Sequence, residues 1–152
     1  MKFDFIIIGA GSAGCVLANK LSNSKNHNVL LIEAGPNDDS FFIKMPIGYG
    51  VTFYNRKINW CYSSEEEKNL CNRKIFWPRG KVIGGSSSIN GLVYHRGQAS
   101  DYDDWEKEGN LGWDYNSLIP FFEEFEQINT ERSNLKKDKL SISYVENKYN
   151  IK

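Results

Sequence analysis

Three glycines near the start of the chain have the spacing of a phosphate-binding turn. Gly9, Gly11 and Gly14 follow the pattern G-x-G-x-x-G. In such a turn the first glycine permits a sharp bend, the second lets the backbone approach a diphosphate, and the third lets a helix pack closely on a strand. The free N–H groups around Ser12 and Ala13 would face the phosphates, because they open the helix at the positive end of its dipole. The motif therefore predicts a dinucleotide-binding turn.

An acidic side chain at the matching distance extends this prediction to a ribose. Glu33 lies about 20 residues beyond Gly14, where a carboxylate can accept hydrogen bonds from the ribose diol. A carboxylate at this place opposes a 2'-phosphate, so NADP is disfavoured relative to NAD or FAD. The turn and the carboxylate together do not decide between NAD and FAD.

The turn needs a strand before it and a helix after it, and the flanking sequence predicts both. Residues 5–8 are a short apolar run rich in β-branched side chains, which is typical of a buried parallel strand. A helix should follow, with Val16, Leu17 and Leu21 on one face. A second apolar run at residues 29–32 leads into the acidic side chain. The pattern predicts one βαβ unit.

A second glycine-rich stretch, residues 84–91, carries another candidate site. Two adjacent glycines precede three serines, so backbone N–H groups and hydroxyls can reach a polar ligand with little bulk in the way. A flexible glycine-serine linker is the alternative. Apolar residues flank the stretch at 82–83 and 92–93, however, which a flexible linker would lack. We therefore expect an ordered ligand-binding turn.

The overall composition argues against several functional classes. The 152 residues include 19 Lys and Arg against 19 Asp and Glu, so no net charge attracts nucleic acid or an anionic membrane. No apolar run approaches the roughly 18 residues of a membrane span. Asp4 interrupts the one segment that resembles a signal peptide. Three cysteines and two histidines predict reduced thiols, no metal cluster and a cytoplasmic location.

Residues 41–77 show no regular period but are rich in aromatic side chains. So long an irregular segment is unusual inside a compact domain, so it is either poorly ordered or wraps a large ligand. The aromatic content favours the second interpretation, because disordered segments are poor in such residues. The charged run at 65–68 is predicted to be a loop.

Several further motifs follow the two glycine turns in a fixed order. Glu-Ala-Gly lies at 33–35, Met-Pro-Ile-Gly-Tyr-Gly at 45–50, Trp-Pro-Arg-Gly at 77–80 and Arg-Gly at 96–97, and the series ends with 101–105 and 112–115. Together with residues 9–14 and 84–90, this series resembles the glucose-methanol-choline (GMC) oxidoreductases, which are FAD enzymes that oxidise alcohols. Choline dehydrogenase-like members are the most similar, and the resemblance extends to about residue 126.

The resemblance implies non-covalent FAD as the cofactor. The diphosphate would lie at the first turn, the adenosine ribose at Glu33, and the flavin along the second stretch, with Asn90 hydrogen-bonding near the isoalloxazine. Some relatives bind flavin covalently through a histidine at the position of Ile89, which isoleucine cannot do. His95 has the strand-like context of a structural histidine, so no catalytic residue is predicted. The implied cofactor-binding residues are Gly9, Gly11, Ser12, Ala13, Gly14, Glu33, Ala34, Val82, Gly85, Asn90, Gly91 and Val93.

The βαβ pattern and the resemblance together predict an α/β fold, a partial Rossmann-like FAD/NAD(P)-binding domain that is incomplete relative to the family. We expect residues 1–128 to form the N-terminal part of the FAD-binding domain. Residues 129–152 would be a polar tail that begins a truncated substrate domain, with one candidate strand at 140–145.

Two helices should precede the polar tail. Ser100 can cap the first, and Gly109 can end it. The second should begin at Asn116 or Ser117, because Pro120 is tolerated only in a first helical turn.

Three functions remain open from the sequence. The first is the FAD-binding portion of an oxidoreductase that acts on the CH–OH group of a small alcohol, its C-terminal part supplied for example by a separately encoded chain. The second is a truncated, catalytically inactive fragment of such an enzyme. The third, an NAD-binding Rossmann module, leaves residues 84–90 without a role.

The two flavin hypotheses share one structural prediction: the turn at Gly11 and residues 84–90 converge on a single FAD molecule. Groups that close over the flavin in the family come from regions that this sequence lacks. We therefore expect the isolated chain to bind FAD weakly or not at all.

Overall fold

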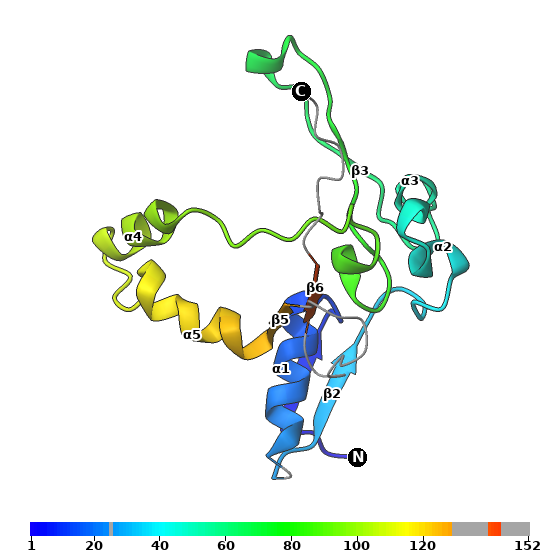
Figure 1. Ribbon diagram of the computed structural model, residues 1–152. Helices are drawn as coiled ribbons and strands as arrows, with labels where there is room; N and C mark the ends of the chain where they lie inside the picture. The colour runs from blue at the N-terminus through cyan, green and yellow to red at the C-terminus, as the bar shows by residue number, and fades with distance from the viewer. Residues whose placement is uncertain (25, 129–139, 144–152) are drawn as a thin grey trace. The chain divides into compact units, whose positions relative to one another are not determined.

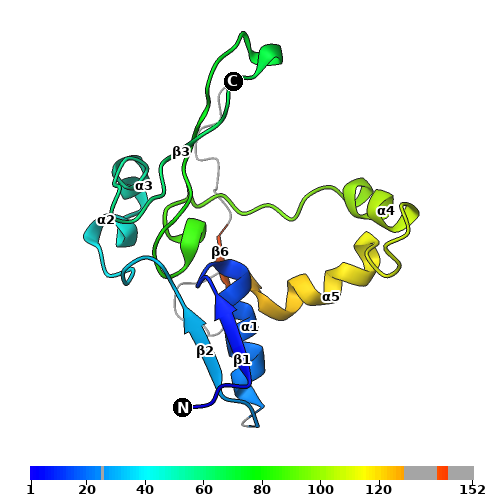
Figure 2. The ribbon, with the colours of Figure 1, turned by 180° about the vertical axis from the view of Figure 1, so that it is seen from behind.

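The computed structural model describes residues 1–24, 26–128 and 140–143 (Figures 1 and 2). The chain folds as two compact units, the first ending at Val93 and the second beginning at Tyr94. The predicted domain boundary between residues 128 and 129 adjoins residues outside the described ranges, and it stays a prediction. Among the described residues, no helix is both long enough and apolar enough to cross a bilayer.

The first unit opens with the predicted βαβ motif. Strand β1 (Phe5–Ile8) is followed by helix α1 (Ser12–Asn23) and strand β2 (Val29–Ile32). The strands pair in parallel with Phe5 opposite Val29, and α1 runs along the pair (Figure 2). The prediction of an α/β, Rossmann-like fold is confirmed, because a β-branched run, a glycine turn and an amphipathic helix follow one another with the required spacing.

The described part of this sheet has only two strands, which leaves apolar side chains open to solvent. Ile8 is 86% exposed and Ile6 60% exposed, although both belong to a run that is typical of strands covered on two faces. The described residues of the first unit therefore supply less cover than a parallel sheet normally has.

The aromatic segment after β2 is built from short elements. It contains helix α2 (Phe41–Lys44), the 3-10 turn η1 (Pro46–Gly48) and helix α3 (Tyr49–Thr52). The antiparallel strands β3 (Tyr62–Ser63) and β4 (Phe76–Trp77) then form a hairpin. The predicted loop at 65–68 is confirmed for Glu65 and Glu66, whereas Glu67 forms an isolated antiparallel bridge with Arg73 and Lys68 begins the 3-10 turn η2 (Lys68–Leu70).

A buried asparagine fixes the base of this hairpin. Asn59 is 2% exposed, and its Oδ1 accepts hydrogen bonds from the N–H groups of Cys61 at 2.8 Å and Arg79 at 3.0 Å. Its Nδ2 donates to the carbonyl of Phe53 at 2.7 Å. One side chain therefore ties both arms of the hairpin to the end of α3.

The core of the first unit lies directly under the second glycine-rich stretch. Ile58, Val82 and Ile89 are buried together, and Ile43 from α2 packs against them. The stretch itself forms a 3-10 turn, η3 (Gly85–Ser88). Residues 84–91 are therefore anchored to a core through Val82 on one flank and Ile89 within the stretch, whereas the other predicted flank, Leu92 and Val93, is exposed.

The second unit contains helices α4 (Ala99–Lys107) and α5 (Tyr115–Phe125) and the parallel strands β5 (Glu126–Ile128) and β6 (Leu140–Ile142). The strand predicted at 140–145 is confirmed for its first three residues; positions 144 and 145 lie outside the described residues. Strand β5 was not predicted.

Both predicted helix starts in this unit were wrong. Gln98, not Ser100, caps α4, and its backbone N–H donates to Asp101 in a capping box. Asp114 caps α5 by accepting from the N–H of Ser117 at 3.1 Å. Pro120 consequently lies in the second turn of α5, one turn further in than expected.

A buried carboxylate organises the second unit. The Glu126 side chain is 5% exposed and accepts hydrogen bonds from the Tyr94 hydroxyl and from two nitrogens of Arg96, the Nε at 2.8 Å. The Arg96 guanidinium also lies 5.3 Å from the Phe122 ring centre. The bonds from Arg96 lower the pKa of Glu126, whereas burial, with Glu126 beside it, raises the pKa of Tyr94 to about 12.

Candidate dinucleotide-binding site

The first glycine turn has the backbone geometry that its sequence predicts. Gly9 has a φ of +96°, a conformation that favours glycine. A Cβ on Gly14 would lie 1.9 Å from the Gly9 carbonyl oxygen, so α1 packs against the turn too closely for any side chain there. Gly11 differs, because a Cβ there would lie 4.0 Å from its nearest neighbour, the Cα of Gly85. The fold itself therefore requires glycine at positions 9 and 14, and leaves room at position 11.

The first turn of α1 offers unpaired backbone donors. Gly11 is the N-cap, and it provides no side-chain cap. The first i to i−4 bond of the helix runs from the Cys15 N–H to the Gly11 carbonyl at 2.9 Å. The N–H groups of Ser12, Ala13 and Gly14 therefore have no acceptor within the helix, and they lie at the positive end of its dipole. This arrangement suits an anionic oxygen.

The Glu33 carboxylate braces the turn. Its Oε2 accepts from the Ala10 N–H at 2.7 Å, and its Oε1 accepts from the Gly35 N–H at 3.0 Å. A carboxylate has roughly four lone-pair sites, so each oxygen retains capacity for a further donor such as a ribose hydroxyl. Ala34 is exposed beside it. Sequence reasoning did not foresee that this carboxylate also holds the glycine turn.

The second glycine-rich stretch meets the first turn directly. The Gly84 N–H donates to the Ala10 carbonyl at 2.7 Å, and the Ser12 and Ser87 hydroxyls are hydrogen-bonded to each other. A Cβ on Gly85 would lie 2.8 Å from the Cα of Gly11, so the two backbones touch. The predicted convergence of the two turns is confirmed, and a shared cofactor stays a prediction.

Two further glycines belong to this junction, although sequence reasoning gave them no structural part in it. A Cβ on Gly35 would lie 1.8 Å from the Lys81 carbonyl oxygen, and one on Gly80 would lie 2.1 Å from the Gly85 carbonyl oxygen. The Ile83 N–H also donates to the Pro36 carbonyl at 3.0 Å. The segment that follows β2 therefore joins the same backbone cluster. The only sequence signal for these contacts was that Gly35 and Gly80 belong to the family-like motifs at 33–35 and 77–80.

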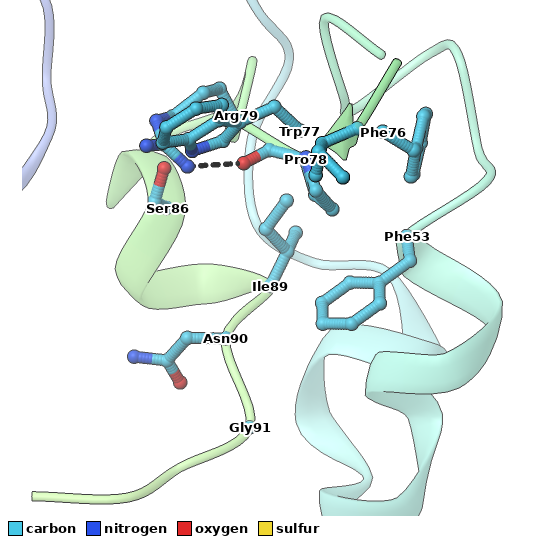
Figure 3. Close-up of a pocket in the computed structure, with 10 residues that line it drawn as sticks. Phe53, Phe76, Trp77, Pro78, Arg79, Ser86, Ile89, Asn90 and Gly91 are labelled. Carbon is cyan, nitrogen blue, oxygen red and sulfur yellow. Dashed lines mark hydrogen bonds between the residues drawn. The ribbon is translucent and has the colours of Figure 1, made fainter. Parts of the chain in front are cut away.

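Beside the junction lies a pocket of about 440 Å³ (Figure 3). The Phe53 ring lies on one side, and the turn from Ser86 to Gly91 lies on the other. The Arg79 guanidinium stacks 5.1 Å from the Trp77 ring centre. The lining is mostly aromatic and apolar with a few polar groups, a composition that small-molecule sites share. The lining residues are Phe53, Ile75, Phe76, Trp77, Pro78, Arg79, Ser86, Ile89, Asn90 and Gly91.

The remaining predicted residues have different positions relative to this pocket. Asn90 and Gly91 line it, and the Asn90 Oδ1 accepts from the Leu92 N–H at 2.9 Å. Val82 is fully buried in the core, so its side chain supports the second stretch from beneath. Val93 is 86% exposed at the end of the first unit. Gly85 is buried against the first turn.

A family model described as GMC oxidoreductase matches residues 3–151, nearly the whole chain. The chain belongs to the GMC oxidoreductase family. It corresponds to the FAD-binding region of that family, and the resemblance drawn from its motifs is confirmed.

Curated members of the GMC family include choline dehydrogenases that are similar to this chain. The oxygen-dependent choline dehydrogenase of Vibrio vulnificus (strain YJ016) is 52% identical over 120 residues, which cover 79% of this chain and 21% of that protein. The mitochondrial choline dehydrogenase of Homo sapiens is 44% identical over 128 residues, covering 80% of this chain and 22% of that protein. The chain thus spans about a fifth of the length of these relatives.

Solved structures of oxidases share the fold of this GMC region. Pyridoxine 4-oxidase from Mesorbium loti superposes with a TM-score of 0.79 at 34% identity, covering 84% of this chain and 25% of that one. A formate oxidase of Aspergillus oryzae RIB40, a protein in which FAD modification has been studied, gives a TM-score of 0.75 at 31% identity, covering 84% and 22%.

The histidine that follows the GMC motif makes a local contact. His95 is exposed, and its Nδ1 accepts from the Gly97 N–H at 2.8 Å. This bond shapes the chain around residues 95–97, within the second unit.

Proposed function

We propose that this chain is the FAD-binding portion of an oxidoreductase that acts on CH–OH groups, similar to choline dehydrogenase. The observation that carries the proposal is the direct contact between the two glycine turns, which joins the candidate phosphate-binding turn to the pocket beside residues 86–91. The Gly84 N–H bond to the Ala10 carbonyl at 2.7 Å holds the two parts together. A dinucleotide that carries a large planar ring system needs both parts at once.

Each part of FAD would meet a different group of the chain. The free N–H groups at Ser12 and Ala13 would bind the diphosphate, and Glu33 would accept from the adenosine ribose. The flavin would extend along the second stretch, past Gly85, toward Asn90 and Gly91. When bound, FAD supplies a hydride acceptor for alcohol oxidation; the residues of this chain bind the cofactor and orient it.

We further propose that the FAD is dissociable. Ile89 stands where some GMC relatives carry the histidine that bonds to the flavin, and an alkyl side chain cannot form such a bond. Ile89 is also buried in the core with Ile58 and Val82. Acid precipitation of any flavin-loaded form should leave the flavin in the supernatant, whereas flavin that stays with the pellet would contradict this proposal.

The substrate class and the source of the rest of the enzyme are part of the proposal as well. The substrate class is a small alcohol, and its oxidation requires the remaining part of a GMC enzyme, supplied in the same polypeptide or by a separately encoded C-terminal chain. The exposed Ile6 and Ile8 on β1 support further polypeptide covering this sheet.

We also propose a cytoplasmic location, supported by the free thiols of Cys15, Cys61 and Cys71. Fractionation of cells that express the protein tests this directly. Recovery from a secreted or periplasmic fraction would contradict it.

A chimera tests the FAD proposal most directly. Residues 1–126 of this chain would replace the matching region of the Vibrio vulnificus choline dehydrogenase, to which the chain is 52% identical over 120 residues. We expect the purified chimera to show the visible absorption of bound flavin and to oxidise choline. The isolated chain, which spans about a fifth of the length of that enzyme, should show little flavin or none.

The control is Gly11→Ala in the chimera. The structure has room for this methyl group, 4.0 Å from the Cα of Gly85, and the φ of −78° suits alanine. The variant should fold but lose FAD, because the methyl group lies where the diphosphate must approach the backbone. Unchanged flavin content would show that the phosphate turn is assigned wrongly.

A further inference from the structure

The three consecutive serines of the second glycine-rich stretch have three different partners. The Ser86 hydroxyl accepts from the Gly80 N–H at 3.1 Å, and the Ser88 hydroxyl donates to the Ile83 carbonyl at 2.7 Å. Both of these bonds stay within residues 80–88. Ser87 instead bonds to the hydroxyl of Ser12, 75 residues earlier in the chain. Among the three, Ser87 alone connects its side chain to the phosphate turn.

The bonded pair of hydroxyls leaves one proton available to a ligand. Two neutral hydroxyls carry two protons, and their mutual hydrogen bond uses one of them. Both serines are exposed, so the second proton can be donated outward. A diphosphate oxygen can only accept a hydrogen bond. When such an oxygen is present, one serine hydroxyl therefore donates to its partner serine, and that partner donates its own proton to the phosphate.

The backbone around the pair fixes which serine lies next to the ligand. Ser12 is the first residue of α1, beside the free N–H groups, whereas Ser87 lies in η3, the turn that contacts Gly11 through Gly85. The Ser12 hydroxyl is thus on the side of the donors that would bind an anion.

We propose that Ser87 is a positioning residue for the diphosphate: its hydroxyl donates to the Ser12 Oγ, and this orients the Ser12 hydroxyl to donate to a phosphate oxygen. The inference rests on the proposed function and deepens it, because it assigns a role to a residue outside the predicted set. It acts through Ser12 and does not touch the cofactor itself.

Amide chemical shifts of the full chain test the positioning without any ligand. Ser87→Ala should shift the N–H signals of Ser12 and Ala13, and Ser87→Thr should restore them, because threonine keeps the hydroxyl. Ser88→Ala is the matched control, since it removes one serine bond from the same turn and should leave these signals in place. Equal effects of Ser87→Ala and Ser88→Ala on the Ser12 and Ala13 signals would overturn the inference.

FAD titration of the flavin-free chimera tests the role in binding, because the chimera is the form expected to hold the cofactor. Ser87→Ala in the chimera should weaken FAD binding about three- to tenfold, the usual effect of one lost hydrogen bond. In a Ser12→Ala background the same change should have almost no effect, since Ser87 acts through Ser12. An additive loss in the double variant would overturn the inference.

The two arms separate this inference from the proposed function. If the chimera with choline dehydrogenase binds no flavin, the assignment of the phosphate turn fails, and with it the proposed function. The ligand-free shifts of Ser87→Ala against Ser88→Ala then decide by themselves whether Ser87 positions Ser12.

Discussion

The two units of the chain are stabilised in different ways. In the first, backbone touches backbone: Gly85 lies against Gly11, and Gly35 lies against the Lys81 carbonyl. In the second, side chains converge on one buried carboxylate, Glu126, which accepts three hydrogen bonds from Tyr94 and Arg96. The stability of the first unit therefore depends on the absence of side chains at a few glycine positions. The stability of the second unit depends on the charged pair of Glu126 and Arg96.

This difference matches what each unit can do for a ligand. The cluster around Glu126 satisfies its polar groups internally, so it offers little to a second partner. The glycine junction in contrast leaves the N–H groups of Ser12, Ala13 and Gly14 without helical acceptors. A binding site of this kind consists of donors that folding has left unpaired, held in place by contacts elsewhere.

The strongest test of the backbone-built unit is Gly35→Ala. The added Cβ would lie 1.8 Å from the Lys81 carbonyl oxygen, so backbone must move. We expect a loss of about 4 kcal/mol or more, enough to unfold the first unit, with the signals of the second unit retained in NMR spectra. Gly91→Ala is the control, because a Cβ there meets nothing within 4 Å. Similar stability of the two variants in urea unfolding would contradict the comparison.

The Asn59 side chain also stabilises the first unit, and Asn59→Ala measures its contribution to the free energy of unfolding. The change leaves the N–H groups of Cys61 and Arg79 and the Phe53 carbonyl without the partner that they share. Buried groups without partners should cost about 3 kcal/mol in the free energy of unfolding. Asn55→Ala removes one such bond, to Lys57, and should cost less than half as much. A larger loss for Asn55→Ala would reverse this ranking.

In the second unit, Glu126→Gln should remove about 2 kcal/mol of stability at neutral pH, since it leaves the partly buried Arg96 without its charge partner. Arg96 lowers the pKa of Glu126 below its ordinary value of 4.5. The carboxylate therefore stabilises the fold fully above about that pH, and this stabilisation is lost as the pH falls through the lowered pKa. Urea unfolding of both proteins across the acid range should show their difference shrinking. A difference that does not change with pH would refute the charge-based account.

The smallest effect is expected for Tyr94→Phe, about 1 kcal/mol for one hydrogen bond to Glu126. The pKa of Tyr94 is raised from 10.0 to about 12. Its stabilisation is therefore complete below pH 10.0 and is lost as the pH rises toward about 12. Alkaline unfolding should show this loss in the wild type and not in the variant. Tyr54→Phe, at a 74% exposed position, is the control; an equal response from it would exclude a special role for Tyr94.

The local parts of the fold followed from the sequence. Strand β1, helix α1 and strand β2 were predicted with their order and positions, because each depends on a period or a turn within about ten residues of itself. The meeting of the two glycine turns was also predicted. That step needed the resemblance to GMC oxidoreductases, since no local pattern specifies a contact between Ala10 and Gly84.

The misses have physical causes. Gln98 is a weak capping residue by type, and it caps α4 only because Asp101 completes the reciprocal bonds. Strand β5 has no recognisable pattern of its own, since its first residue is the buried Glu126. The role of Asn59 depends on Arg79, 20 residues further on, and such pairings are set by the tertiary fold.

The bond between Ser12 and Ser87 has a consequence for how the protein is made. The first of these residues leaves the ribosome 75 residues before the second. During that interval the glycine turn can be held by Glu33 but lacks its contact with the second stretch. The two turns can therefore join only after all the residues between them have been synthesised, so their contact forms late and across a long separation in sequence.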